Sequence, residues 1–200
     1  QDELHSALRD LEQTLDSSAQ PGGAASAAGA PVGGFPQGAE WVTRAGIKVD
    51  RIASAWLIRR YLDPGAHLLF VPAAGYRPKA GQLRFDMFQA EYTHEGDACT
   101  FEVLLNRSGL HDPALRAIAE IVHDLDLKDG KYGRPETDGI GRLLAGLVQR
   151  HEEDEARLEA GCRLFDDLHA SYRSAPFKKT SSSVKNTTNL STNFTTNGTP

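Results

Sequence analysis

Residues 41–71 read WVTRAGIKVDRIASAWLIRRYLDPGAHLLFV, and this stretch decides the fold class. WVTR (41–44) is typical of a short strand, and residues 51–62 repeat apolar side chains at helical spacing until an Asp-Pro-Gly turn at 63–65. HLLFVP (67–72) then predicts a buried strand. A strand, a helix and another strand place a small β-sheet in this first half of the body.

The rest of the body is predicted to be mostly helical. LRFDMF (83–88) indicates one more short strand, and a helix is expected to begin near Cys99. Asp112 and Pro113 form an N-cap and a first-turn proline, and apolar spacing predicts further helices over 140–150 and 154–172. The sequence therefore predicts a helix-rich single domain, α/β or α+β, with its small β-sheet contributed by the first half of the body.

Composition divides the chain into four segments. Residues 1–16 carry leucines at every third or fourth position and predict an amphipathic connecting helix, which needs the body, a second copy or an upstream domain as partner. Residues 17–40 are rich in Ala, Gly, Ser and Pro and predict a flexible linker. The body spans 41–175, and the Asn-, Thr- and Ser-rich residues 176–200 predict a disordered tail foreign to the domain.

Charge and hydropathy exclude two function classes. The 200 residues carry 22 Lys and Arg against 27 Asp and Glu, so the chain as a whole is no electrostatic match for nucleic acid. No apolar run approaches the roughly 18 residues of a membrane-spanning helix. Two cysteines, Cys99 and Cys162, are too few for a disulfide framework, and no leader precedes the body. We therefore expect a fragment of a soluble, cytoplasmic protein.

Histidines and carboxylates recur at a spacing that suits metal binding. Glu91 lies three residues before His94, and Glu120 lies three residues before His123. Paired Glu-x-x-His units build two-metal sites in helical bundles, whereas one site of two histidines and one or two carboxylates suits Fe, Mn or Zn. The predicted metal ligands are Glu91, His94, Glu120 and His123, and the secondary candidates are Cys99, Glu102 and Asp124.

Each of these residues also has a plainer interpretation. Acidic side chains before a helix are usually solvated, and His123 fits a hydrogen-bonded histidine inside a helix. The pair His123-Asp124 matches one step of metal-dependent phosphohydrolases, which need further ligands on other helices. A buried structural cysteine is commoner than a reactive one, and Cys162 falls on the apolar face of the last helix.

Basic residues form two candidate anion sites. Three precede or begin the helix 51–62, whose N-terminus offers free N–H groups, although Asp50 is its natural N-cap and would compete with an anion. Three more crowd the turn after His123, where a solvated charged turn is the alternative. The predicted oxyanion ligands are Arg44, Lys48, Arg51, Lys128, Lys131 and Arg134.

Four long segments, in this order, resemble one known family. They are residues 41–71, RFDMFQAEYTHEGDACTFEVLL (84–105), DPALRAIAEIVHDLDLKDGKYGRPE (112–136) and FDDLHASY (165–172). Together they look like the chromate-resistance (ChrB-type) C-terminal domain. In that family the domain follows a winged-helix-like DNA-binding region, and the whole is regarded as a chromate-responsive regulator of a chromate-efflux operon.

The resemblance implies a chromate-responsive sensing domain for a tetrahedral oxyanion. From the spacing of the histidines and glutamates we also expect a divalent metal ion, Fe, Mn or Zn. We expect no organic cofactor and no membrane contact, and a homodimer is possible. DNA would be bound only through an N-terminal region outside these 200 residues. The alternative is an Fe- or Mn-dependent oxidoreductase that acts on superoxide or on chromate itself, and whether the chain is an enzyme stays open.

Overall fold

A computed structural model describes residues 32–174 of the chain. The helix expected over 1–16, most of the expected linker and the tail 176–200 lie outside the described residues. Within them a short 3-10 turn, η1 (Val32–Gly34), precedes a parallel sheet of three strands in the order β2-β1-β3. The strands are β1 (Glu40–Arg44), β2 (His67–Val71) and β3 (Leu83–Arg84).

The central strand carries the packing of the sheet. Trp41, Val42 and Thr43 are fully buried, as expected for a parallel strand covered on both faces. The strand expected at 67–72 is confirmed as β2, but it is not buried, because it is an edge strand whose Leu69 is 37% exposed. The strand expected at 83–88 ends at Arg84, since the chain turns away through a positive φ of 46° at Asp86.

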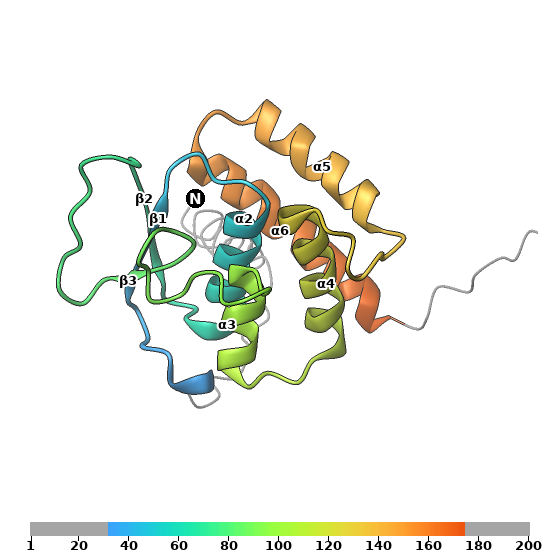
Figure 1. Cartoon of the computed structure of the whole chain (residues 1–200), viewed down its shortest axis with the longest axis horizontal. Coiled ribbons are helices and arrows are strands. Elements are labelled where there is room, and N and C mark those ends of the chain that lie inside the picture. Colours follow the sequence, from blue (N-terminus) through green and yellow to red (C-terminus); the bar gives the residue numbers. More distant parts are fainter. Residues whose placement is uncertain (1–31, 175–200) are drawn as a thin grey trace, which may run out of the picture.

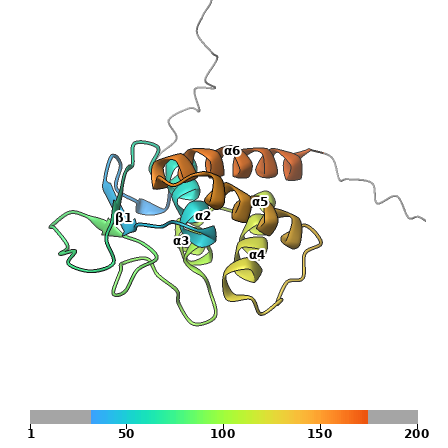
Figure 2. The same ribbon diagram turned by 90° about the horizontal axis from the view of Figure 1, so that it is seen from above.

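The predicted helices are present in the described residues. They are α2 (Val49–Leu57), α3 (Thr100–Ser108), α4 (Pro113–Leu127), α5 (Thr137–Arg150) and α6 (Asp154–Arg173). The helix expected over 51–62 continues after α2 as a π-helical segment, η2 (Ile58–Leu62). The sheet lies at one end of the molecule, α2 and α3 lie next to it, and α4 lies beyond them, while α6 runs past α2 from the sheet end to the α4 end (Figure 1). The second view shows the same order and shows α6 running along the top of the helices (Figure 2). The predicted helix-rich domain with a small sheet is confirmed.

The core centres on α2, which packs against α3, α4 and α6. Ile52, Trp56 and Leu57 of this helix are fully buried, and the Trp56 ring lies 5.5 Å from the ring of Phe165 on α6. None of the helices in the described part of the chain has the length and apolar character that crossing a bilayer requires.

The packed body begins before the end of the expected linker. Phe35 is 4% exposed, and its ring lies 6.0 Å from that of Trp41. The buried carboxylate of Asp63 accepts N–H groups from Gly38 and Ala39 at 2.7 and 2.9 Å. The prediction that 17–40 is a linker therefore does not hold for residues 35–40, because an aromatic ring and a buried acceptor fix this stretch.

A second buried aspartate fixes the loop between β1 and α2. Asp154, the first residue of α6, accepts the N–H groups of Gly46 at 2.7 Å and Ile47 at 2.9 Å. These partners are more than a hundred positions away in the sequence. The loop that leads into α2 is thus held by the last helix of the domain.

Candidate functional site

Asp50 lies in the first turn of α2 and points at the first turn of α3. Its carboxylate accepts the backbone N–H groups of Thr100 at 2.8 Å and Phe101 at 2.9 Å, and the hydroxyl of Ser54 at 3.1 Å. The prediction that Asp50 caps its own helix is wrong: Lys48 is the N-cap residue of α2 and makes no side-chain cap. Asp50 instead supplies the acceptor for unpaired N–H groups of α3.

Three more side chains meet Asp50 at this point. His94 Nε2 lies 3.3 Å from Asp50 Oδ2, 3.3 Å from Asp126 Oδ2 and 3.7 Å from Asp86 Oδ1. We call Asp50, Asp86, His94 and Asp126 the carboxylate–histidine cluster. Its members come from α2, from the loop between β3 and α3, and from the last turn of α4, so only the tertiary fold brings them together.

The loop from β3 to α3 places Asp86 and His94 in the cluster. The Asp86 N–H donates to the carbonyl of Tyr92 at 2.9 Å, which closes the loop on itself. Thr100 Oγ1 donates to Asp86 Oδ1 at 3.3 Å and holds the carboxylate toward the start of α3. The positive φ of Asp86 is an unfavourable conformation for a residue with a side chain, and such strain is common at functional sites.

The cluster holds more negative charge than its surroundings neutralise. Burial raises the pKa of Asp86, and the nearby charge of Asp50 raises it further. Burial and Asp50 likewise raise the pKa of Asp126, while the hydrogen bond to Asp50 raises the pKa of His94. Arg51 is the adjacent cation, with its Nε 3.0 Å from Asp86 Oδ2. Three carboxylates outnumber one arginine and one histidine, and this excess of negative charge favours the binding of a positive ion.

The donor set fits a divalent metal ion. Asp50, His94 and Asp126 each offer a ligand atom, and these atoms lie within 4.8 Å of one another. A ligand set of carboxylate oxygens and one imidazole suits Mn or Fe, whereas structural zinc is typically held by thiolate-rich sets. The side chains of His94 and Asp126 are 38% and 31% exposed, so one side of the cluster faces solvent.

A second group surrounds His123 on α4. His123 is fully buried, with Nδ1 2.6 Å from Glu102 Oε2 and Nε2 3.2 Å from Asp129 Oδ2. Since both acceptors are carboxylates, both ring nitrogens donate only in the imidazolium form. Burial by itself lowers the pKa of His123, but the hydrogen bonds to Glu102 and Asp129 outweigh it, and the net pKa is raised.

The secondary candidates Glu102 and Asp124 serve this group. Glu102 also accepts the N–H of Cys99 at 3.0 Å, as part of a capping box at the start of α3, and separately accepts the hydroxyl of Tyr132 at 3.0 Å. Asp124 accepts the N–H groups of Tyr132 and Gly133 at 3.1 and 2.7 Å. These acceptors are already satisfied, and they attach the charged turn after α4 to the body.

The four predicted metal ligands do not gather at one point. His94 lies in the carboxylate–histidine cluster, whereas His123 lies in the second group. Glu91 pairs with Arg84 at 2.8 Å, and Glu120 pairs with Arg134 at 2.9 Å. The two glutamates therefore face guanidinium groups, and the pair Glu91–His94 lies in a loop, not on a helix.

The six predicted oxyanion ligands divide between paired and exposed side chains. Arg51 pairs with Asp86, Lys131 with Asp97 at 2.7 Å, and Arg134 with Glu120. Arg44, Lys48 and Lys128 are exposed, the last as the left-handed C-cap of α4. Of the six, Arg51 is the one that contacts the carboxylate–histidine cluster.

Both cysteines are buried. Burial raises the pKa of Cys99 strongly and raises the pKa of Cys162 to about 11. A thiol with a raised pKa is a poor nucleophile and a poor metal ligand at neutral pH. Cys162 is confirmed as a core residue, 2% exposed, and Cys99 is the buried N-cap residue of α3.

Sequence reasoning missed Asp50, Asp86 and Asp126 as candidate ligands. Asp126 lies three residues after His123 on α4, but that spacing would have assigned it to His123, whereas the structure places it beside His94. Asp50 looked like an ordinary N-cap, and Asp86 looked like a strand residue. No local pattern shows that their carboxylates meet.

Comparison with known proteins identifies relatives of this chain. Residues 41–172 match the family described as "ChrB, C-terminal domain". Protein ChrB of Cupriavidus metallidurans (strain ATCC 43123 / DSM 2839 / NBRC 102507 / CH34) is 38% identical over 144 residues, which are 72% of this chain and 43% of that protein. The chain thus spans less than half of this relative. No solved structure gives a significant match.

Proposed function

Because the chain belongs to the family of ChrB C-terminal domains, we propose that it is the chromate-responsive module of a chromate-resistance protein and binds a divalent metal ion at the carboxylate–histidine cluster. Family membership supports the role in chromate resistance. One observation carries the assignment of the site: His94 Nε2 lies 3.3 Å from both Asp50 Oδ2 and Asp126 Oδ2.

A bound metal ion would also explain how an oxyanion could bind at a negatively charged cluster. Three carboxylates repel chromate, whereas a bound divalent ion offsets their charge and offers it a Lewis-acid partner. Arg51 lies beside Asp86 in the same cluster, and a guanidinium forms charge-assisted hydrogen bonds with tetrahedral anions. Chromate and sulfate are nearly isosteric, so the shape of the site alone does not distinguish them. A redox-active metal ion would, because chromate is an oxidant and sulfate is not.

Elemental analysis after chelator washing and reloading with Mn²⁺ or Fe²⁺ tests the metal site. We expect about one metal ion per chain in the wild type and a loss of at least about tenfold in affinity for Asp126→Asn, since changing even an outer-shell partner of a ligand costs about 10–100-fold. Glu91→Gln is the matched control, because it removes a carboxylate that the sequence predicts as a ligand and that the structure pairs with Arg84.

Two results would overturn the assignment. One is a metal content far below one per chain after reloading. The other is an equal loss in Glu91→Gln and Asp126→Asn, which would favour the site predicted from sequence. Chromate affinity, measured against sulfate in the loaded and metal-free protein, then tests the sensing role. If the affinity for chromate is the same in both forms, chromate does not bind at the metal ion.

The second candidate function is a metal-dependent oxidoreductase that acts on superoxide or chromate. The solvent-facing side of the cluster favours it, because His94 is 38% exposed and leaves room for a small substrate. Removal of superoxide by the Mn- or Fe-loaded protein, lost in Asp126→Asn and kept in Glu91→Gln, would support turnover. Metal binding without any turnover would exclude the oxidoreductase and favour the sensing module.

A further inference from the structure

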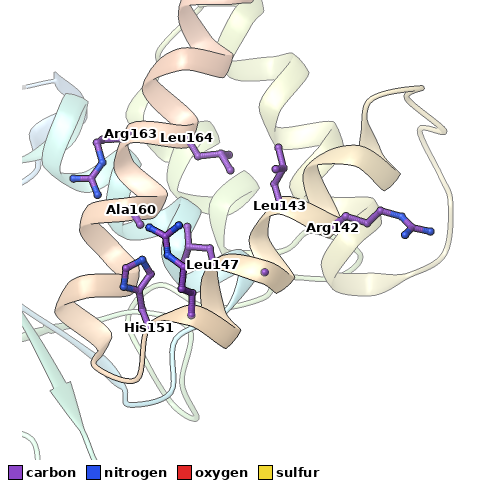
Figure 3. A pocket seen from close by; sticks show the side chains of 9 residues that line it. Arg142, Leu143, Leu147, His151, Ala160, Arg163 and Leu164 are labelled. Atoms are coloured by element: carbon purple, nitrogen blue, oxygen red, sulfur yellow. The ribbon is translucent and has the colours of Figure 1, made fainter.

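A groove of about 510 Å³ separates α5 from α6 on the surface of the helical part. Leu143 and Leu147 of α5 and Leu164 of α6 form its apolar floor. Three arginines, Arg142, Arg150 and Arg163, also line the groove. Figure 3 shows Arg142 on α5 and Arg163 on α6. No part of the candidate metal site lies in it.

Helix α5 is the least covered helix of the described residues. Leu144 is its one buried residue, whereas α4 buries nine of its residues. Leu143 is 59% exposed, and Leu147 is only half-buried. An apolar helix face that lies open to solvent is a candidate binding surface for another apolar element.

The arginines around the groove differ from most others in the domain. Arg142, Arg150 and Arg163 form no ion pair within residues 32–174, whereas Arg59 and Arg60 pair with acids of α6. In Figure 3 the side chains of Arg142 and Arg163 point away from each other. They flank the apolar floor and do not converge on one point, so a small anion does not match this arrangement. An occupant with an apolar centre and acidic flanks does.

We propose that residues 1–16 of the same chain dock in this groove as an amphipathic helix. This segment carries leucines at 4, 8, 11 and 15, and five acidic residues against one arginine. At 100° per residue the four leucines form one stripe, with Glu12 and Asp16 on one side of it and Glu3 and Asp10 on the other. This places acids opposite the arginines on both rims of the groove.

The lengths also agree. A helix rises about 1.5 Å per residue, so the leucine stripe is about 16 Å long and the α5 side of the groove, from Arg142 to Arg150, is about 12 Å long. Residues 17–31 reach about 50 Å when extended, which exceeds the diameter of a domain of this size. A direct path from η1 to the groove is therefore within the reach of this segment.

Hydrogen exchange measured by mass spectrometry on the whole chain tests this docking. We compare the wild type with Leu8→Asp/Leu11→Asp, which breaks the stripe, and with Arg142→Glu/Arg150→Glu, which reverses one rim. In the wild type the amides of residues 1–16 and of the exposed α5 face should exchange at least about tenfold more slowly than in either variant. Arg116→Glu is the control, because it reverses an exposed arginine of α4 that does not line the groove.

Three outcomes would overturn the proposal. Equal exchange of residues 1–16 in the wild type and the leucine variant would show that the segment does not dock in this chain. Protection that grows with protein concentration, together with a doubled mass in light scattering, would place the segment on a second copy. Protection that survives Arg142→Glu/Arg150→Glu but not Leu8→Asp/Leu11→Asp would place it on another surface of the body.

Discussion

The carboxylate of Asp50 accepts the backbone N–H of Phe101 at 2.9 Å and so joins the start of α2 to the start of α3, 51 positions later. The same carboxylate lies 3.3 Å from His94 in the candidate metal site. One side chain thus holds two helices together and contributes to the charge of the cluster. Any variant of Asp50 must therefore be measured for stability as well as for metal binding.

We expect Asp50→Ala to lower the free energy of unfolding by about 3 kcal/mol, because it leaves buried N–H groups of α3 without an acceptor. Urea unfolding at neutral pH measures this loss. Ser54→Ala is the matched control, since it removes only the 3.1 Å hydrogen bond to the same carboxylate and should cost about 1 kcal/mol. Equal losses in the two variants would contradict the capping role.

The imidazolium of His123 should make stability depend on pH. The pKa of His123 is raised in the folded state, so the folded protein binds this proton more tightly than the unfolded chain. The stabilisation is fully present below the unfolded pKa of about 6.5 and is lost as the pH rises through the higher folded value. The free energy of unfolding, measured in urea between these values, should fall with pH in the wild type relative to His123→Gln.

His111→Gln is the control for this pH series, because His111 is exposed and lies on the loop before α4. Its unfolding free energy should follow that of the wild type at every pH. A wild-type protein whose stability relative to His123→Gln rises over the same interval would mean that His123 is neutral in the fold.

Gly161 marks the closest approach of α6 to α2. A Cβ at this position would collide with the Cγ2 methyl of the fully buried Ile52. We expect Gly161→Ala to destabilise the domain by about 1–3 kcal/mol through overpacking. Gly139→Ala, at a helical position with no atom near the new methyl, should instead be neutral or slightly stabilising. Thermal unfolding of the two variants, side by side, distinguishes these outcomes.

Neither cysteine should react with alkylating reagents in the native protein. Burial raises the pKa of both thiols, and Cys162 reaches about 11, so little thiolate exists at neutral pH. Mass spectrometry after iodoacetamide treatment should find no label on Cys99 or Cys162 until the protein is unfolded. Rapid labelling of native Cys99 would reopen its role as a ligand or attacking thiol.

Helix caps and apolar spacing, which act between residues close in sequence, correctly predicted the helices. Asp112 caps α4 with a 2.8 Å hydrogen bond to the Ala114 N–H, and Pro113 occupies the first turn, as the sequence indicates. Apolar spacing likewise located α5 and α6. The burial of β2 was overestimated because an apolar run does not show whether a strand is central or at an edge.

The candidate site could be predicted only in part. His94 and His123 were predicted as ligands from the Glu-x-x-His spacing, but their partners depend on which loops and helices meet. Asp50 reaches α3 because α2 packs against it, and Asp86 turns inward because the loop after β3 closes at Tyr92. Spacing along the chain contains neither fact. The glutamates at 91 and 120 fitted a ligand spacing, yet each lies next to an arginine that the spacing does not reveal.

The bond between Asp154 and the Gly46 N–H links positions 108 residues apart, which constrains how the domain is made on the ribosome. Until α6 has left the exit tunnel, the loop before α2 lacks its acceptor, and Trp56 lacks the Asp166 carboxylate that its Nε1–H contacts at 2.8 Å. The nascent N-terminal half therefore cannot complete its packing early. Folding of the body therefore awaits the synthesis of α6, and chains truncated before α6 are expected to be substrates for proteases.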